Sequence, residues 1–167
     1  KSITMWSHYA DSHKGFVLEY DLKNLNCQCD TCNKKDTCSD RVIYNLYPII
    51  YDNRRYDATS FVECYLGLSL GLNAKIDDKM YYTKAALYKS TQWQYEKEWR
   101  LFLNKDNSTG LSCLNIKVKP VAIYYGNDMS AINKKILSGM AKEKGIKEYQ
   151  MYIDTQSDKY SMKFRKI

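Results

Sequence analysis

Apolar residues recur along the chain at two spacings, and these spacings separate the predicted strands from the predicted helices. Phe16, Leu18 and Tyr20 alternate with other residues, which predicts a strand over Phe16–Tyr20. Two longer segments repeat their apolar residues at the spacing of a helix face. One stripe consists of Phe61, Tyr65, Leu68 and Leu72, and the other consists of Ile132, Ile136 and Met140.

Capping residues predict where the helices begin. Ser60 and Glu63 have the spacing of a capping box, which should open the helix that carries the first stripe over Phe61–Leu72. Ser130 should cap the second, over Ile132–Lys144, and Gly145 should end it. Two shorter helices are expected behind Thr4 and behind either Asp77 or Asp78.

The remaining apolar segments predict short strands, interspersed with helices without strict alternation. This order favours an α+β fold with a mixed, largely antiparallel sheet and about three packed helices. We expect the two stripes to pack on a sheet that contains Phe16–Tyr20, Trp99–Leu103 and Val121–Tyr125. Further strands are expected at Tyr44–Tyr51, Leu114–Val118, Ile146–Ile153 and Tyr160–Phe164.

Composition is compatible with a single domain over residues 1–167, because 44% of the residues are hydrophobic and 27% are charged. The absence of an apolar run of about 20 residues argues against a membrane span, and the absence of a secretory leader favours a cytoplasmic protein. The formal net charge of +7 is compatible with a nucleic acid or another anionic partner. The lysines are scattered along the chain, however, and a general bias in amino-acid composition would also give such a positive net charge.

Four of the six cysteines lie in one polar segment, residues 24–40, which we expect to be a loop. Cys27, Cys29, Cys32 and Cys38 could together bind a structural zinc ion. Their spacing is not that of a standard pair of zinc knuckles. Free thiols or disulfides are the alternatives, and a reducing cytoplasm disfavours disulfides.

Both histidines of the chain lie in one short motif. His8 and His13 accompany Trp6, Tyr9 and Asp11. Histidine exchanges protons near neutral pH, so the pair is a candidate catalytic site with Trp6 and Tyr9 as binding residues. Alternatively, His8 caps a short helix and His13 shapes a turn.

A row of charges follows along the chain. At the two-residue period of a strand, Glu96, Glu98 and Arg100 share one face, with about 7 Å between alternate residues. Trp99 and Leu101 should then be buried on the other face. Such a row suits a general base, or a carboxylate that holds a ribose hydroxyl or an oxocarbenium-like centre. A solvated sheet face is the alternative.

These motifs, taken together, resemble the bacterial family named "domain of unknown function 2971". The resemblance rests on Met5-Trp6-Ser-His8-Tyr9-Ala10, His13-Lys14-Gly15-Phe16, Glu19-Tyr20-Asp21, Tyr47-Pro48-Ile-Ile-Tyr51, Lys89-Ser90, Trp93-x-Tyr95-Glu96-x-Glu98-Trp99-Arg100 and Ile123-Tyr-Tyr-Gly126. The family name implies no activity. Its members carry a further N-terminal segment, so we expect this chain to be the C-terminal part of such a domain or a shortened member. Uncovered apolar surface would then favour a homo-oligomer.

The short Glu96-x-Glu98 motif also resembles a motif of ADP-ribosyltransferases. NAD is implied as the cofactor only if the chain has that type of activity. The leading hypothesis is an enzyme that acts on nucleotides or nucleic acid, in a context of phage defence. In it His8 carries a proton, Glu98 polarises the substrate and Arg100 pairs with a phosphate. The alternative is a non-catalytic, zinc-stapled module that binds nucleic acid or a protein.

Overall fold

The computed structural model describes residues 2–23, 42–73, 75, 78, 80–102, 119–158 and 160–167. The fold is α+β, as predicted, with helices and a mixed, mostly antiparallel set of strands. The chain divides into two compact units. Unit 1 comprises Lys1–Tyr44 and Lys105–Ile167, and unit 2 comprises Asn45–Asn104. Each unit is described by itself, and the single domain over residues 1–167 stays a prediction.

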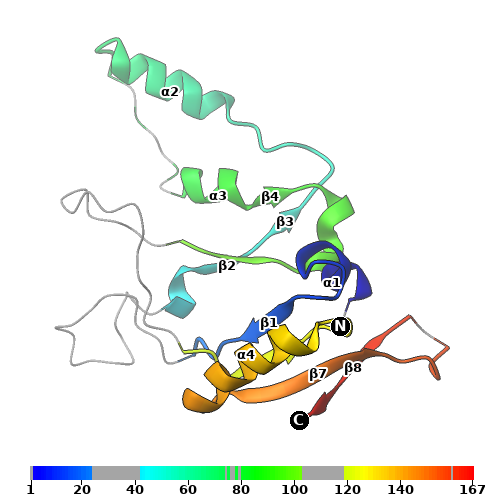
Figure 1. Ribbon diagram of the computed structural model, residues 1–167. Coiled ribbons are helices and arrows are strands. Elements are labelled where there is room, and N and C mark those ends of the chain that lie inside the picture. The colour runs from blue at the N-terminus through cyan, green and yellow to red at the C-terminus, as the bar shows by residue number, and fades with distance from the viewer. Residues whose placement is uncertain are drawn as a thin grey trace. The chain divides into compact units, whose positions relative to one another are not determined.

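Unit 1 is built on a sheet in which, among the described residues, four strands take the order β1-β6-β7-β8. The β1–β6 and β7–β8 pairs are antiparallel, whereas β6 and β7 are parallel and are connected through α4 (Figure 1). A parallel pair needs such a crossover, and a helix supplies it. The elements are α1 (Ile3–Tyr9), β1 (Phe16–Glu19), β6 (Ala122–Tyr125), α4 (Ala131–Glu143), β7 (Lys147–Ile153) and β8 (Met162–Lys166).

The core of unit 1 has two parts, one on each face of the sheet. Neighbouring residues of a strand point to opposite faces, so Tyr124 lies on one face and Tyr125 on the other. On the Tyr124 face, α1 packs its buried Trp6 against the sheet. On the Tyr125 face, α4 packs its buried Ala141 against β6. The buried residues are Trp6, Ala10, Met151 and Met162 in the first cluster, and Ile123, Tyr125 and Ala141 in the second.

The helix α4 begins as predicted but buries a different face. The Ser130 hydroxyl accepts a hydrogen bond from the Asn133 amide at 3.2 Å, which confirms the cap. The predicted stripe is wrong, because Ile132, Ile136 and Met140 are 73%, 54% and 54% exposed. The helix instead approaches the sheet through Ala141, with Leu137 beside it. A small side chain permits this close approach, and a pattern that weights large apolar residues misses it.

The first helix also differs from its predicted start. It begins at Ile3, and the Ser2 hydroxyl rather than Thr4 accepts the hydrogen bond from the Met5 amide, at 3.3 Å. Serine and threonine are both common helix caps, so a sequence that offers both residues near the helix start does not fix which of them caps it.

Among its described residues, unit 2 contains two short ladders of two strands each. In one, β2 (Leu46–Pro48) pairs antiparallel with β5 (Trp99–Leu101). In the other, β3 (Ile50–Tyr51) pairs parallel with β4 (Tyr88–Lys89). The unit's other elements are α2 (Thr59–Ser69), α3 (Tyr81–Leu87) and the 3-10 helix η2 (Thr91–Glu96), and a further 3-10 helix, η1 (Val42–Asn45), directly precedes β2.

The predicted three-strand sheet is therefore wrong in one member. The strands β1 and β6 pair with each other, but β5 pairs with β2. The expected burial of Trp99 is wrong too, since this side chain is 58% exposed and Leu101 is only half-buried. A three-residue strand in a two-stranded ladder has few neighbours on either face, so alternation alone does not bury a residue there.

The apolar stripe of α2 is also largely uncovered. Phe61 stacks on Tyr81 of α3, with ring centroids 4.2 Å apart, but Leu68 is 50% exposed and Leu72 is 61% exposed. The predicted capping box is wrong, because α2 begins at Thr59 and its amide donates to the Asp57 carboxylate at 2.9 Å. The predicted cap of α3 is wrong as well, because Met80 occupies the cap position and no side chain caps the helix; Asp78 instead accepts from the Met80 amide, at 2.9 Å.

Candidate functional site

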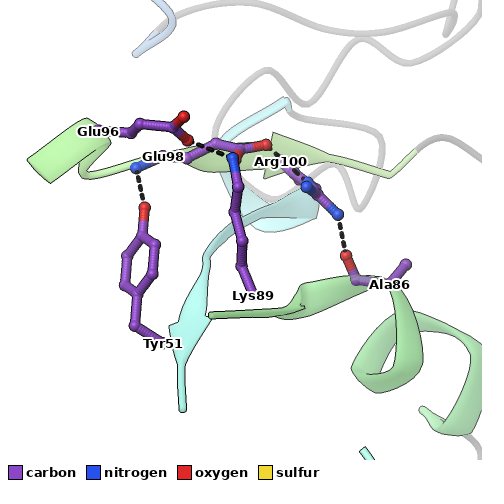
Figure 2. Close-up of polar contacts among 6 residues, drawn as sticks. All are labelled: Tyr51, Ala86, Lys89, Glu96, Glu98 and Arg100. Atoms are coloured by element: carbon purple, nitrogen blue, oxygen red, sulfur yellow. Dashed lines mark hydrogen bonds and ion pairs between the residues drawn. The ribbon is translucent and has the colours of Figure 1, made fainter. Parts of the chain in front are cut away.

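The charged row of the sequence becomes a network around Lys89 in unit 2 (Figure 2). Helix η2 ends at Glu96 and is capped by Lys97, whose φ of +50° is in the left-handed region. This turn of the backbone separates Glu96, the last residue of η2, from Glu98, which comes directly before β5. Both carboxylates nevertheless hydrogen bond to the Lys89 ammonium, at 2.9 Å in the case of Glu98.

Glu98 is the most connected member of the network. Its two carboxylate oxygens accept hydrogen bonds from the Lys89 ammonium and from Nε of Arg100, the latter at 2.7 Å. Its backbone amide donates to the Tyr51 hydroxyl at 2.8 Å. Arg100 in turn donates to the carbonyl of Ala86 (Figure 2). The side chain of Glu96 is only 4% exposed and that of Glu98 is 28% exposed, so water competes weakly for these contacts.

These contacts fix the charges of the network. The hydrogen bonds from Arg100 and then from Lys89 lower the pKa of Glu98 to about 2, against a smaller opposing effect of burial. Burial opposes the charge of Lys89, but the hydrogen bonds to Glu96 and Glu98 outweigh it and raise the pKa of Lys89 above its ordinary value. Glu98 is therefore an ionised carboxylate at neutral pH and a weak proton acceptor. The arrangement favours a fixed negative charge over a general base.

A pocket of about 540 Å³ lies beside this network, and Lys89 belongs to both. All of its lining residues come from unit 2. The Asp52 amide donates to the Lys89 carbonyl at 3.0 Å, and the Asp52 carboxylate accepts from the Arg54 amide at 2.8 Å, which shapes one wall. The lining residues are Asp52, Asn53, Arg54, Arg55, Tyr56, Ala58, Ala85, Tyr88, Lys89 and Ser90.

The pocket carries two cations that sequence reasoning missed. Arg54 and Arg55 are exposed and, within the described ranges, neither guanidinium has an ion-pair partner. Lys89, Glu96, Glu98 and Arg100 of the neighbouring network balance one another's charges. The signal in the sequence was a pair of arginines that begins three residues after the end of a predicted strand, inside a stretch that otherwise looks like a polar turn.

The histidine motif of unit 1 divides between the core and the surface. Trp6 is 5% exposed and packs with Met151, so its indole belongs to the core. His8 is exposed, and its ring lies edge-on to that of Tyr9, with centroids 6.4 Å apart. Tyr9 is itself 59% exposed. The two side chains are thus at the surface of α1, where a ligand could reach them.

The turn that follows α1 is fixed by an unusually close backbone contact. Asp11, Ser12 and His13 all have positive φ, from +45° to +68°. A Cβ on Gly126 would lie 2.0 Å from the His13 carbonyl oxygen, so only glycine fits there. The same carbonyl accepts from the Asp128 amide at 3.0 Å. The Nδ1 atom of His13 is buried and, in the described part of the chain, has no hydrogen-bond partner.

Comparison with known protein families shows the family of the chain. The family model described as "Protein of unknown function (DUF2971)" matches residues 5–101. The chain belongs to this family. Neither the curated proteins nor the solved structures include a match.

The DUF2971 match contains both candidate motifs and ends at the last residue of β5, before the strands β6, β7 and β8. The structure brings together Glu96, Glu98 and Arg100 within unit 2 and adds Lys89 to them. His8 and His13 lie in unit 1. Their convergence with the carboxylates on one cleft stays a prediction, as does the catalytic role of all five residues.

The predicted zinc ligands Cys27, Cys29, Cys32 and Cys38 lie outside the described residues, as do Leu103 and the predicted strand over Leu114–Val118. Within the described residues, no group of three or more histidine, cysteine or acidic side chains could hold a metal ion. The zinc site therefore stays a prediction. In the same residues, no helix has the length and apolar character needed to cross a membrane.

Proposed function

We propose that this member of the DUF2971 family is an enzyme that acts on a nucleotide or a nucleic acid, and that the pocket of unit 2 binds a phosphate of the substrate. One observation carries the proposal: Arg54 and Arg55, two guanidiniums that have no ion-pair partner among the described residues, line a pocket whose wall is continuous with an ionised carboxylate network.

The pocket's side chains match the chemistry of a nucleotide. Guanidinium groups pair with phosphate oxygens through two parallel hydrogen bonds, which makes arginine well suited to this ligand. Tyr56 and Tyr88, whose ring centroids are 5.0 Å apart, add aromatic surface for a base. Apart from Lys89, whose charge the network balances, the pocket lining carries two positive side chains, Arg54 and Arg55, and one negative side chain, Asp52. Its net charge is therefore positive and favours an anion.

Glu98 would serve this substrate as a fixed anion. A carboxylate with a pKa of about 2 cannot usefully take up a proton at neutral pH. It can accept a hydrogen bond from a ribose hydroxyl, or stabilise positive charge that develops on a ribose carbon. If the chemistry is of the ADP-ribosyltransferase type, the substrate is NAD and Glu98 faces its nicotinamide-side ribose.

Binding of ADP, measured by titration calorimetry, tests the phosphate site. We expect the double variant Arg54→Gln/Arg55→Gln to bind ADP at least about tenfold more weakly than the unaltered chain, because charged hydrogen bonds contribute more than 1 kcal/mol each. The matched control is Lys135→Gln/Lys142→Gln on α4, which removes the same charge in unit 1. Equal affinity in the unaltered chain and the arginine variant, or equal losses in both variants, would refute the site.

The alternative function, a non-catalytic binding module, is favoured by one feature of the network. Both oxygens of Glu98 are already engaged by Lys89 and Arg100, as in a purely structural ion cluster. Release of nicotinamide from NAD, followed by chromatography, separates the two functions for that substrate. The ADP-ribosyltransferase reaction predicts release by the unaltered chain and none by Glu98→Gln, with ADP binding retained. ADP binding without release in either protein favours the module.

A further inference from the structure

The face of the unit 1 sheet that carries α1 also carries three aromatic rings, one from each of three successive strands. Tyr124 of β6 stacks on Tyr149 of β7, with centroids 4.9 Å apart. Phe164 of β8 meets both rings edge-on, at 5.4 and 5.3 Å. The three rings brace one another, so they form a preorganised aromatic surface, which we call the aromatic face.

This face is only partly covered. The buried side of α1 contacts Met151 and Met162, toward one end of the sheet. Phe164 remains 46% exposed and Val17 of β1 remains 44% exposed. Between α1 and the strands lies a groove of about 620 Å³, whose lining includes Met5, Trp6, Val17, Tyr124 and Phe164.

Two lysines and one glutamate surround the aromatic face. Lys166 lies opposite Tyr149 in the β7–β8 register, and Lys147 lies two residues before Tyr149, so all three project from the same face. Both lysines are exposed and, over the described ranges, neither has an ion-pair partner. Glu19, also in the groove lining, accepts a hydrogen bond from the Tyr124 hydroxyl at 2.5 Å and is thereby tied to the sheet.

We propose that the aromatic face of unit 1 binds single-stranded nucleic acid, whose bases stack on Phe164 and the tyrosines while Lys147 and Lys166 contact its phosphates. Aromatic rings on neighbouring β-strands, with cations beside them, suit a single-stranded nucleic acid. Each base has a flat face that can stack on a ring, and each phosphodiester carries a negative charge that a lysine can contact. An apolar protein partner would leave both lysines buried without a counter-charge. This site uses no residue of the unit 2 pocket and does not rest on the proposed function.

Fluorescence anisotropy with labelled oligouridylate and oligothymidylate, each about 12 nucleotides long, tests the proposal on the full chain. Phe164→Leu keeps an apolar side chain at an exposed position but removes the ring, and we expect about tenfold weaker binding. Tyr149→Leu should act in the same direction. Lys166→Gln should reduce the slope of log affinity against log salt by about one. Lys135→Gln on α4 is the matched charge control and should change the affinity less than twofold.

The outcomes separate this face from its competitors. Equal losses in Lys166→Gln and Lys135→Gln would show that only net charge matters and would overturn the site. Loss of binding in Arg54→Gln/Arg55→Gln with none in Phe164→Leu would assign the strand to unit 2 and overturn it as well. A third outcome would assign the face to a second copy of the chain instead. In it, the unaltered chain binds no oligonucleotide and sediments as a dimer in ultracentrifugation, and the Phe164→Asp variant sediments as a monomer.

Discussion

The Trp6–Gly15 segment of unit 1 and the Lys89–Arg100 segment of unit 2 both carry chemistry-bearing side chains, yet the two units employ them differently. In unit 1, the indole of Trp6 is buried in the core, and the turn at His13 is fixed by its backbone against Gly126. In unit 2, Lys89 and Glu98 are held by charge-assisted hydrogen bonds beside a pocket.

This difference indicates which motif residues maintain the fold and which are available for chemistry. A residue constrained by close packing tolerates almost no change, whereas a residue constrained by ion pairs can exchange one partner for a ligand. On this basis the unit 2 motif is the better candidate site. In unit 1, His8 and Tyr9 are exposed and lie outside the buried core cluster.

The largest expected effect is that of Gly126→Ala. The added Cβ would lie 2.0 Å from the His13 carbonyl oxygen, so the turn must separate from β6. We expect a loss of more than about 3 kcal/mol in unfolding free energy. Hydrogen exchange followed by mass spectrometry should show the loss in unit 1.

Gly139→Ala is the matched control for this change. A Cβ there would meet no atom within 4 Å, and the residue lies inside α4. Alanine favours a helix over glycine by about 0.5–1 kcal/mol, so this variant should be slightly more stable. If Gly126→Ala unfolds no more readily than Gly139→Ala, the close contact of the turn with β6 is not a constraint on the fold.

The second effect in size is that of Lys89→Met, which removes the cation between Glu96 and Glu98. Two partly buried carboxylates would then face each other, and we expect a cost of about 2–4 kcal/mol, measured by chemical denaturation. The control is Lys84→Met, which breaks the exposed pair with Asp78 at 2.5 Å. That pair should contribute almost nothing, because water and salt screen it. Similar costs for both lysines would contradict a special role for the network.

The third effect is a pH dependence of unit 2. The pKa of Glu98 falls from 4.5 to about 2 on folding, so its stabilisation is complete above about 4.5 and is lost as the pH falls toward 2. Allowing for the 28% exposure of the side chain, we expect a loss of about 1–3 kcal/mol over this range. Chemical denaturation at several pH values measures it, and Glu98→Gln should flatten the profile between pH 4.5 and 2. An unchanged profile in that variant would assign the acid sensitivity elsewhere.

Local patterns predicted much of the fold and part of the site. The cap at Ser130 followed from residue types at short spacing. The grouping of Glu96, Glu98 and Arg100 was predicted as one face of a strand, and this basis is wrong, because only Arg100 lies in β5, while Glu96 ends η2 and Glu98 precedes the strand. The partner of β5 did not follow, because pairing depends on contacts between segments that are distant in sequence. Lys89 was missed as a member of the network for the same reason. The β3–β4 ladder and η2 bring it close to Glu98, and a charge pattern reveals neither of these elements.

The smallest expected effect tests the face of α4 that the sequence misassigned. The apolar stripe predicts that Ile136 is a core residue whose replacement by a polar group is costly. The structure leaves it 54% exposed, so Ile136→Gln should change the unfolding free energy by less than about 0.5 kcal/mol. Ala141→Leu, by contrast, adds volume where the helix meets the sheet and should cost about 1–3 kcal/mol. The reverse order, in thermal or chemical unfolding, would mean that the stripe rather than Ala141 faces the sheet.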